Sequence, residues 1–191
     1  EEDGPVWSDD ARATGVGGES AKLATGFRYG DVTAITLDNL KPSTDYVFTL
    51  YGFGWDSPTS GTPYRSSTFE SSLGGDRFTV NLNHYGQGNG LLVTYAYTTD
   101  AAGSPVTISY PTHGNGTFHT SGFTNREAAP GATTAWTTAP WYDDESSGVD
   151  GGYHYTHAYS FGSATATNIN GVDFTGIAGA NPAAANFASV L

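Results

Sequence analysis

Histidine and hydroxyl side chains are the residues of this sequence whose types could support catalysis. His154 and His157 are three positions apart in an expected strand, so their side chains point to opposite faces. That spacing does not suit two ligands of one zinc ion. The sequence has no Gly-x-Ser-x-Gly turn, and without cysteine it has no thiol nucleophile. We therefore expect a protein that is not an enzyme.

Carboxylates form a second candidate site. Asp143, Asp144 and Glu145 are consecutive, and Asp150 follows in a segment rich in Gly and Ser. Paired carboxylates could serve a glycosidase, but these lie in expected loops rather than at strand ends beside a cleft. Solvated loop charge is one interpretation, and calcium binding is the other, because hard oxygen ligands on flexible loops suit Ca²⁺. The candidate calcium ligands are Asp143, Asp144 and Asp150, and we expect no other cofactor.

Aromatic residues make up 14% of the chain, and several fall in or near expected loops, Trp136 and Trp141 among them. Aromatic faces on a sandwich surface can stack on sugar rings, while polar neighbours bind the sugar hydroxyls. Packing at strand ends or between subunits explains the same residues equally well. The candidate glycan-binding residues are Trp55, Asp56, Tyr64, Arg65, Asn83, His84 and Tyr85.

The charge balance excludes two classes of partner. The 191 residues include 7 Lys and Arg against 19 Asp and Glu, a formal net charge of −12. Nucleic acids and anionic lipid surfaces both need a basic footprint, so we expect neither as a partner. No apolar run approaches the roughly 18 residues of a membrane-spanning helix, so no membrane insertion is expected.

The absence of Cys and Met bears on location. A chain without thiols or thioethers is suited to an oxidising exterior. The sequence does not begin with Met, which indicates a processed N-terminus or an excised fragment. We expect a secreted protein, extracellular or at the cell surface, whose signal peptide has been removed.

Short strands must position these residues. The sequence is rich in Thr, Tyr, Phe and Val, its 26 Gly residues suit tight turns, and strong helix formers are scarce. Strands are expected over 32–37, 45–51, 67–69, 77–82, 90–97, 105–110, 117–123, 153–161 and 168–176, with one short helix over 19–25. This pattern predicts an all-β fold: an antiparallel, jelly-roll-like β-sandwich with a C-terminal strand extension.

Composition divides the chain into three parts. Residues 1–127 form the predicted sandwich body. Residues 128–152, rich in Ala, Thr, Pro and Gly and then acidic, are expected to be an exposed linker. Residues 153–191 form a strand-bearing tail that is too short to enclose a core of its own. The tail must complete a sandwich, either its own or that of the next subunit.

Several blocks resemble a family of uncharacterised repeats in large bacterial cell-surface proteins, some with sorting signals or autotransporter features. The blocks are ITLDNLKPSTDY (35–46), LYGFGW (50–55), NGLLVTY (89–95), FHTSGFTN (118–125), YTHAYSFG (155–162) and NGVDFTG (170–176). The resemblance implies an extracellular β-sandwich. In that family the last two blocks open the domain, so the present chain resembles a permuted version with its opening strands at the C-terminus.

The permuted order suggests strand donation between copies. A sandwich without its opening strands exposes an apolar groove and an unpaired edge, which a neighbour's tail could fill by β-strand addition. Such head-to-tail contacts need not close, and they then form a fibre. We therefore expect a self-assembling filament or surface-array subunit whose partners are copies of itself. The alternative is a carbohydrate-binding module of a larger secreted protein. The candidate donor residues are Tyr155, Tyr159, Phe161, Ile169, Val172, Phe174 and Ile177.

Overall fold

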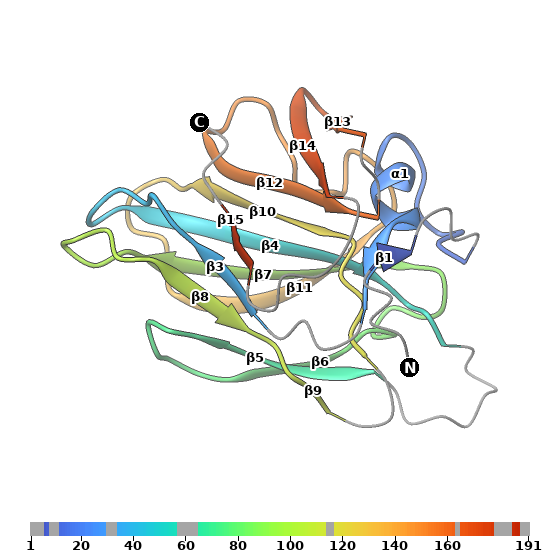
Figure 1. Ribbon diagram of the computed structural model, residues 1–191, viewed down its shortest axis with the longest axis horizontal. Helices are drawn as coiled ribbons and strands as arrows, with labels where there is room; N and C mark the ends of the chain where they lie inside the picture. The colour runs from blue at the N-terminus through green and yellow to red at the C-terminus, as the bar shows by residue number, and fades with distance from the viewer. Residues whose placement is uncertain are drawn as a thin grey trace.

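The protein consists mainly of two β-sheets packed face to face (Figure 1). The computed structural model describes residues 6–7, 12–29, 34–56, 65–113, 117–162, 165–177 and 185–187. The prediction of an all-β sandwich is confirmed. The predicted short helix is also present, as α1 (Ser20–Thr25). Among the described residues, no helix has the length and apolar character needed to cross a membrane.

The larger sheet has seven strands in the order β11-β7-β4-β10-β12-β14-β13. Neighbouring strands are antiparallel except β12 and β14, which are parallel. The strands are β4 (Asp45–Phe53), β7 (Gly90–Thr98), β10 (Gly122–Glu127), β11 (Ala135–Trp141), β12 (Tyr155–Phe161), β13 (Thr167–Ile169) and β14 (Val172–Ile177).

The smaller sheet has five strands in one path, β15-β3-β8-β5-β6, and a sixth, β9, that pairs with β5. These strands are β3 (Ala34–Leu37), β5 (Ser66–Ser71), β6 (Phe78–Asn81), β8 (Val106–Ser109), β9 (Thr112–His113) and β15 (Ala185–Phe187). β15 lies parallel to β3, so the C-terminal part of the chain contributes to both sheets. A separate two-stranded ribbon joins β1 (Val6–Trp7) to β2 (Phe27–Arg28).

The main core lies between the two sheets. Successive side chains of a strand point to opposite faces, so one face of β4 carries Tyr46, Phe48 and Leu50 into this core. Ile35 and Leu37 of β3 belong to the same buried cluster and approach from the smaller sheet. Half-buried and buried residues therefore alternate along β3 and along the first half of β4.

A second buried cluster covers the outer face of the larger sheet. It includes Tyr51 and Phe53 from the other face of β4, Leu23 of α1, and Trp141 at the end of β11. The β13–β14 hairpin closes the same cluster through Phe174. Figure 1 shows α1 and this hairpin on one side of the molecule. The outer face of the seven-stranded sheet is therefore covered in part, while Val47 and Thr49 of β4 stay half-buried.

The structure corrects the expected linker over residues 128–152. Residues 135–141 form β11, which pairs with β7 along its whole length from Ala135↔Ala96 to Trp141↔Gly90. Exposed and half-buried residues alternate along β11, as expected for a strand at the border of a sheet. Between β10 and β12, only residues 128–134 and 142–154 lie outside a strand.

Two expected strands also have different bounds. Residues 168–176 form a hairpin rather than one strand, because Asn170 (φ 49°) and Gly171 (φ 86°) adopt left-handed conformations. An Asn-Gly pair favours this two-residue turn. The strand expected over 117–123 begins only at Gly122, and Thr120 before it forms an isolated bridge with Arg28.

Candidate functional site

The C-terminal strands complete the seven-stranded sheet of their own chain. β12 pairs with β10 in a register that places Tyr159 opposite Phe123 and Ala158 opposite Thr124. The sequence left open whether the tail completes its own sandwich or that of the next subunit, and these pairs lie within one chain. Six backbone positions of β10 are also paired with β4, so β10 is an interior strand only because β12 covers its other side.

The seven candidate donor residues all contribute to packing. Phe161 is buried in the main core, with Tyr159 and Ile177 half-buried against it. The other four are buried in the outer cluster: Tyr155, Ile169, Val172 and Phe174. The segment therefore fills space on both faces of the sheet.

A buried polar network crosses the boundary between β10 and β12. Asn125 Nδ2 donates a hydrogen bond to Thr156 Oγ1 at 2.8 Å, and the Tyr97 hydroxyl donates to Asn125 Oδ1 at 2.9 Å. His157 Nδ1 lies 2.9 Å from the Thr156 hydroxyl. Burial raises the pKa of Tyr97, so its hydroxyl remains a donor. A shift of β12 by one residue would move these groups to the other face and leave buried partners unsatisfied.

Sequence reasoning did not identify this network. Asn125 lies 28 positions from Tyr97 and 31 from Thr156, so no local pattern joins them. The residue types of β10 and β12 mix polar and apolar side chains, so they gave no signal that Asn125 and Thr156 would be buried together.

Residues 142–154 connect β11 to β12, and Asp144 in this connection binds the start of α1. Its carboxylate accepts the backbone N–H of Ser20 at 2.7 Å and that of Glu19 at 3.1 Å. Partial burial acts to raise the pKa of Asp144, but the hydrogen bonds from Ser20 and Glu19 hold it below its usual value. Gly18 (φ +68°) is required nearby, because a Cβ there would lie 2.7 Å from this carboxylate.

The other two candidate calcium ligands make separate local contacts. Asp143 Oδ1 accepts hydrogen bonds from the Ser146 N–H and hydroxyl, and Asp150 Oδ1 accepts one from the Gly152 N–H at 2.8 Å. Within the described part of the chain, no three acidic or histidine side chains are grouped as they would be around a metal ion. Calcium binding stays a prediction, and the visible role of these carboxylates is to hold the connection.

Replacing Asp144 with alanine is expected to lower the free energy of unfolding by about 1 kcal/mol, the usual effect of losing an N-terminal helix cap. Urea denaturation measures this change. Glu145→Ala is the matched control, since Glu145 is the exposed neighbouring acid. Equal effects of the two substitutions would show that the contact between Asp144 and α1 adds no stability.

The structure brings four of the candidate glycan-binding residues together, at one end of the sandwich. Asn83 Oδ1 accepts the N–H groups of Trp55 and Asp56 at 2.9 and 3.2 Å. Arg65 Nε lies 3.4 Å from Asp56 Oδ2. The Arg12 guanidinium lies 3.2 Å from the centre of the Trp55 ring. These side chains therefore bind one another, and Trp55 offers no open face on the side that Arg12 covers.

The remaining candidate glycan-binding residues are dispersed. His84 and Tyr85 follow β6 with their rings 4.7 Å apart, and the Tyr85 hydroxyl donates to Thr138 Oγ1 of β11 at 3.2 Å. Tyr64 lies outside the described residues.

His119 is a buried titratable residue that sequence reasoning did not single out. Its ring stacks on Phe27 with centroids 4.4 Å apart and meets the Trp55 ring edge-on at 4.5 Å. Burial, followed by the positive charges of Arg65 and Arg12, lowers the pKa of His119 to about 2. The imidazole is therefore neutral at physiological pH and acts as part of the aromatic packing.

Comparison of the chain with protein-family models, with curated proteins and with solved structures finds no match. The resemblance to cell-surface repeats therefore stays an expectation, and the functional argument depends on the geometry of the chain itself.

Proposed function

We propose that this chain is an extracellular structural protein whose copies are joined by their C-terminal strands, each copy closing the sheet of its neighbour. One observation carries the proposal: residues 135–177 supply both borders of the seven-stranded sheet, whereas the body supplies only the middle strands β7, β4 and β10. A body without these residues would leave β7 and β10 with unpaired backbone edges, which favour pairing with another chain.

The connection between body and C-terminal strands suits an exchange. Residues 128–134 contain only Ala, Pro, Gly and Thr, and most of them are exposed. Asp45 holds this connection: its carbonyl accepts the Ala128 N–H at 2.8 Å, and its carboxylate accepts the Gly131 N–H at 2.6 Å. Fully extended, seven residues reach about 25 Å. A different path over this short stretch would place the same strands in a neighbouring copy.

Exchange would preserve the contacts that define the boundary. The seven apolar and aromatic residues and the network around Asn125 would meet the same partners, now supplied by another copy, so only the connection changes. The polar network supports one specific register, which an assembling strand needs. A contact that passes from copy to copy without closing produces a filament. The lack of Cys and Met supports an extracellular setting.

Mixing two single-cysteine variants tests the exchange, because the chain has no cysteine of its own. Thr124 of β10 lies opposite Ala158 of β12. Chains carrying Thr124→Cys are unfolded together with chains carrying Ala158→Cys, refolded at high concentration and oxidised. Exchange predicts a disulfide-linked heterodimer on a non-reducing gel, and electron microscopy of the unsubstituted protein should show filaments.

A matched pair within the body serves as the control. Thr49 and Thr94 face each other across β4 and β7, which stay together in any exchange, so Thr49→Cys and Thr94→Cys chains should not cross-link. Equal cross-linking of both pairs would indicate random collision. If the double variant Thr124→Cys/Ala158→Cys forms only an intrachain disulfide and mixed chains never link, the proposal is wrong.

A further inference from the structure

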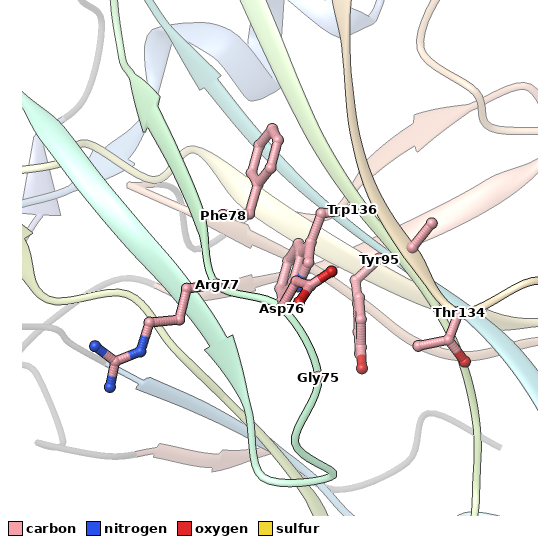
Figure 2. A pocket seen from close by; sticks show the side chains of 8 residues that line it. Gly75, Asp76, Arg77, Phe78, Tyr95, Thr134 and Trp136 are labelled. Atoms are coloured by element: carbon pink, nitrogen blue, oxygen red, sulfur yellow. The ribbon is translucent and has the colours of Figure 1, made fainter.

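A cleft of about 400 Å³ opens on the side of the sandwich where both sheets end. One wall is the turn before β6, from Gly75 to Phe78, and the other is the start of β11, from Thr134 to Trp136. Tyr95 of β7 lies between the two walls (Figure 2). The volume of the cleft lies within the range of roughly 300–1,000 Å³ that is usual for small-molecule sites.

The aromatic side chains of the cleft, Trp136, Tyr95 and Phe78, pack against one another in an aromatic platform. Trp136 stacks on Tyr95 with centroids 4.2 Å apart and planes 22° apart. Phe78 is nearly parallel to Trp136, at 6.2 Å and 7°. Phe69 of the main core packs against Trp136 from another side, at 5.6 Å. The platform is therefore fixed by packing before any ligand arrives, which lowers the entropic cost of binding.

Polar groups of three side chains surround this platform. Tyr95 is only 2% exposed, and its hydroxyl makes no hydrogen bond to any described residue although the side chain lines the cleft. Figure 2 shows the Asp76 carboxylate in front of Trp136 and the Thr134 side chain beyond Tyr95. Arg77 points away, and its Nε lies 3.0 Å from a carboxylate oxygen of Glu70. The cleft thus offers two hydroxyls and one carboxylate around an apolar surface.

This combination points to a neutral sugar. A pyranose ring has an apolar face that suits an aromatic ring, while its hydroxyls donate to a carboxylate and exchange hydrogen bonds with Tyr and Thr hydroxyls. Asp76 and the net charge of −12 disfavour anionic ligands. A quaternary ammonium ion needs ring faces that converge on one point, whereas Trp136 covers one face of Tyr95.

We propose that the cleft binds a neutral saccharide, with Trp136 as its main apolar contact and with Tyr95, Asp76 and Thr134 as partners of the sugar hydroxyls. The site goes beyond the proposed assembly, since it lies at β11 and the strand boundary between β10 and β12 lies elsewhere in the sheet. It differs from the residues around Trp55 selected from the sequence, which bind one another. It requires β11 in place, whichever copy supplies that strand.

Titration calorimetry and tryptophan fluorescence with cello-, xylo-, manno- and chito-hexaose, each at up to millimolar concentration, test the proposal. At least one neutral hexaose should bind. Tyr95→Phe removes only the hydroxyl and keeps the stacked ring, and Asp76→Ala removes an exposed carboxylate. Each should weaken binding about tenfold or more while the unfolding transition stays unchanged. Asp173→Ala and Tyr142→Phe, exposed and outside the cleft, are the matched controls.

Three results would overturn the proposal. They are no binding of any neutral hexaose, binding that Tyr95→Phe and Asp76→Ala leave unchanged, and stronger binding of oligogalacturonate than of every neutral probe. The unfolding transition of each variant, measured in parallel, separates loss of binding from loss of the fold. The cysteine cross-linking experiment is scored independently, so failure of the sugar site and failure of strand exchange are distinguishable.

Discussion

Replacing Arg28 with methionine is expected to stabilise the protein, raising its free energy of unfolding by about 1–4 kcal/mol. Arg28 is 2% exposed, and none of its three guanidinium nitrogens has a hydrogen-bond partner among the described residues. The centre of the Phe161 ring lies 4.9 Å from Cζ of Arg28, a cation–π contact. Burial accordingly lowers the pKa of Arg28, yet an arginine stays charged under ordinary conditions. A buried unpaired charge is strongly unfavourable, and methionine fills similar space without it.

Chemical denaturation of the Arg28→Met variant at neutral pH measures this gain. Arg77→Met is the matched control, because Arg77 is exposed and its ion pair with Glu70 lies at the surface. We expect that control to stay within about 0.5 kcal/mol of the parent protein. Loss of stability in Arg28→Met would show that the guanidinium satisfies a partner that the packing of Phe161 does not account for.

His119 is expected to make the protein sensitive to mild acid. Its pKa is about 2 in the folded chain and about 6.5 when unfolded, so below pH 6.5 the unfolded state binds more protons. The contribution of His119 is complete above pH 6.5 and declines as the pH falls toward 2. At pH 5 the loss is about 2 kcal/mol relative to pH 7.

His119→Phe separates this effect from other titrations. Phenylalanine preserves the ring that stacks on Phe27 and removes the proton-binding nitrogens. Of these, Nδ1 is buried with no hydrogen-bond partner among the described residues. Between pH 7 and pH 5, the unfolding free energy of the parent protein should fall by about 2 kcal/mol more than that of the variant. Parallel pH profiles for the two proteins would contradict the assignment.

A further decline at lower pH should be common to both proteins. The side-chain hydrogen bond from Lys41 lowers the pKa of Glu127. The hydrogen bonds from the Thr98 hydroxyl and from the Gly131 backbone N–H lower the pKa of Asp45. Carboxylates with lowered pKa values stabilise the fold above their unfolded pKa near 4 and lose that contribution as the pH falls. Because Asp45 holds the connection over residues 128–134, acid should also loosen that stretch.

Local patterns were enough to predict most strands. The strands expected over residues 45–51 and 90–97 match β4 and β7, because their aromatic and β-branched residues favour an extended chain. The apolar residues of the C-terminal segment were likewise recognisable. The pair Asn170-Gly171 is typical of a two-residue turn, so the sequence also indicated this hairpin. One continuous strand was predicted there instead.

Strand β11 was not predicted, because its residue types do not by themselves indicate a strand. Its Ala, Thr and Pro content resembles that of a linker, and its strand conformation depends on pairing with β7, about 40 positions earlier in the chain. An outer strand has one free side and can tolerate Pro140, which a central strand could not.

The sequence by itself determined an acidic, cysteine-free, all-β chain and the identity of most of its core residues, since composition and period-two alternation are local properties. Tertiary structure alone decided where the aromatic rings lie: Arg12 covers one face of Trp55, whereas Trp136 stacks on Tyr95 and lines a cleft. It likewise joined Tyr97, Asn125 and Thr156 into one network. Contacts between residues far apart in the chain follow from strand order and register, which no short stretch of sequence specifies.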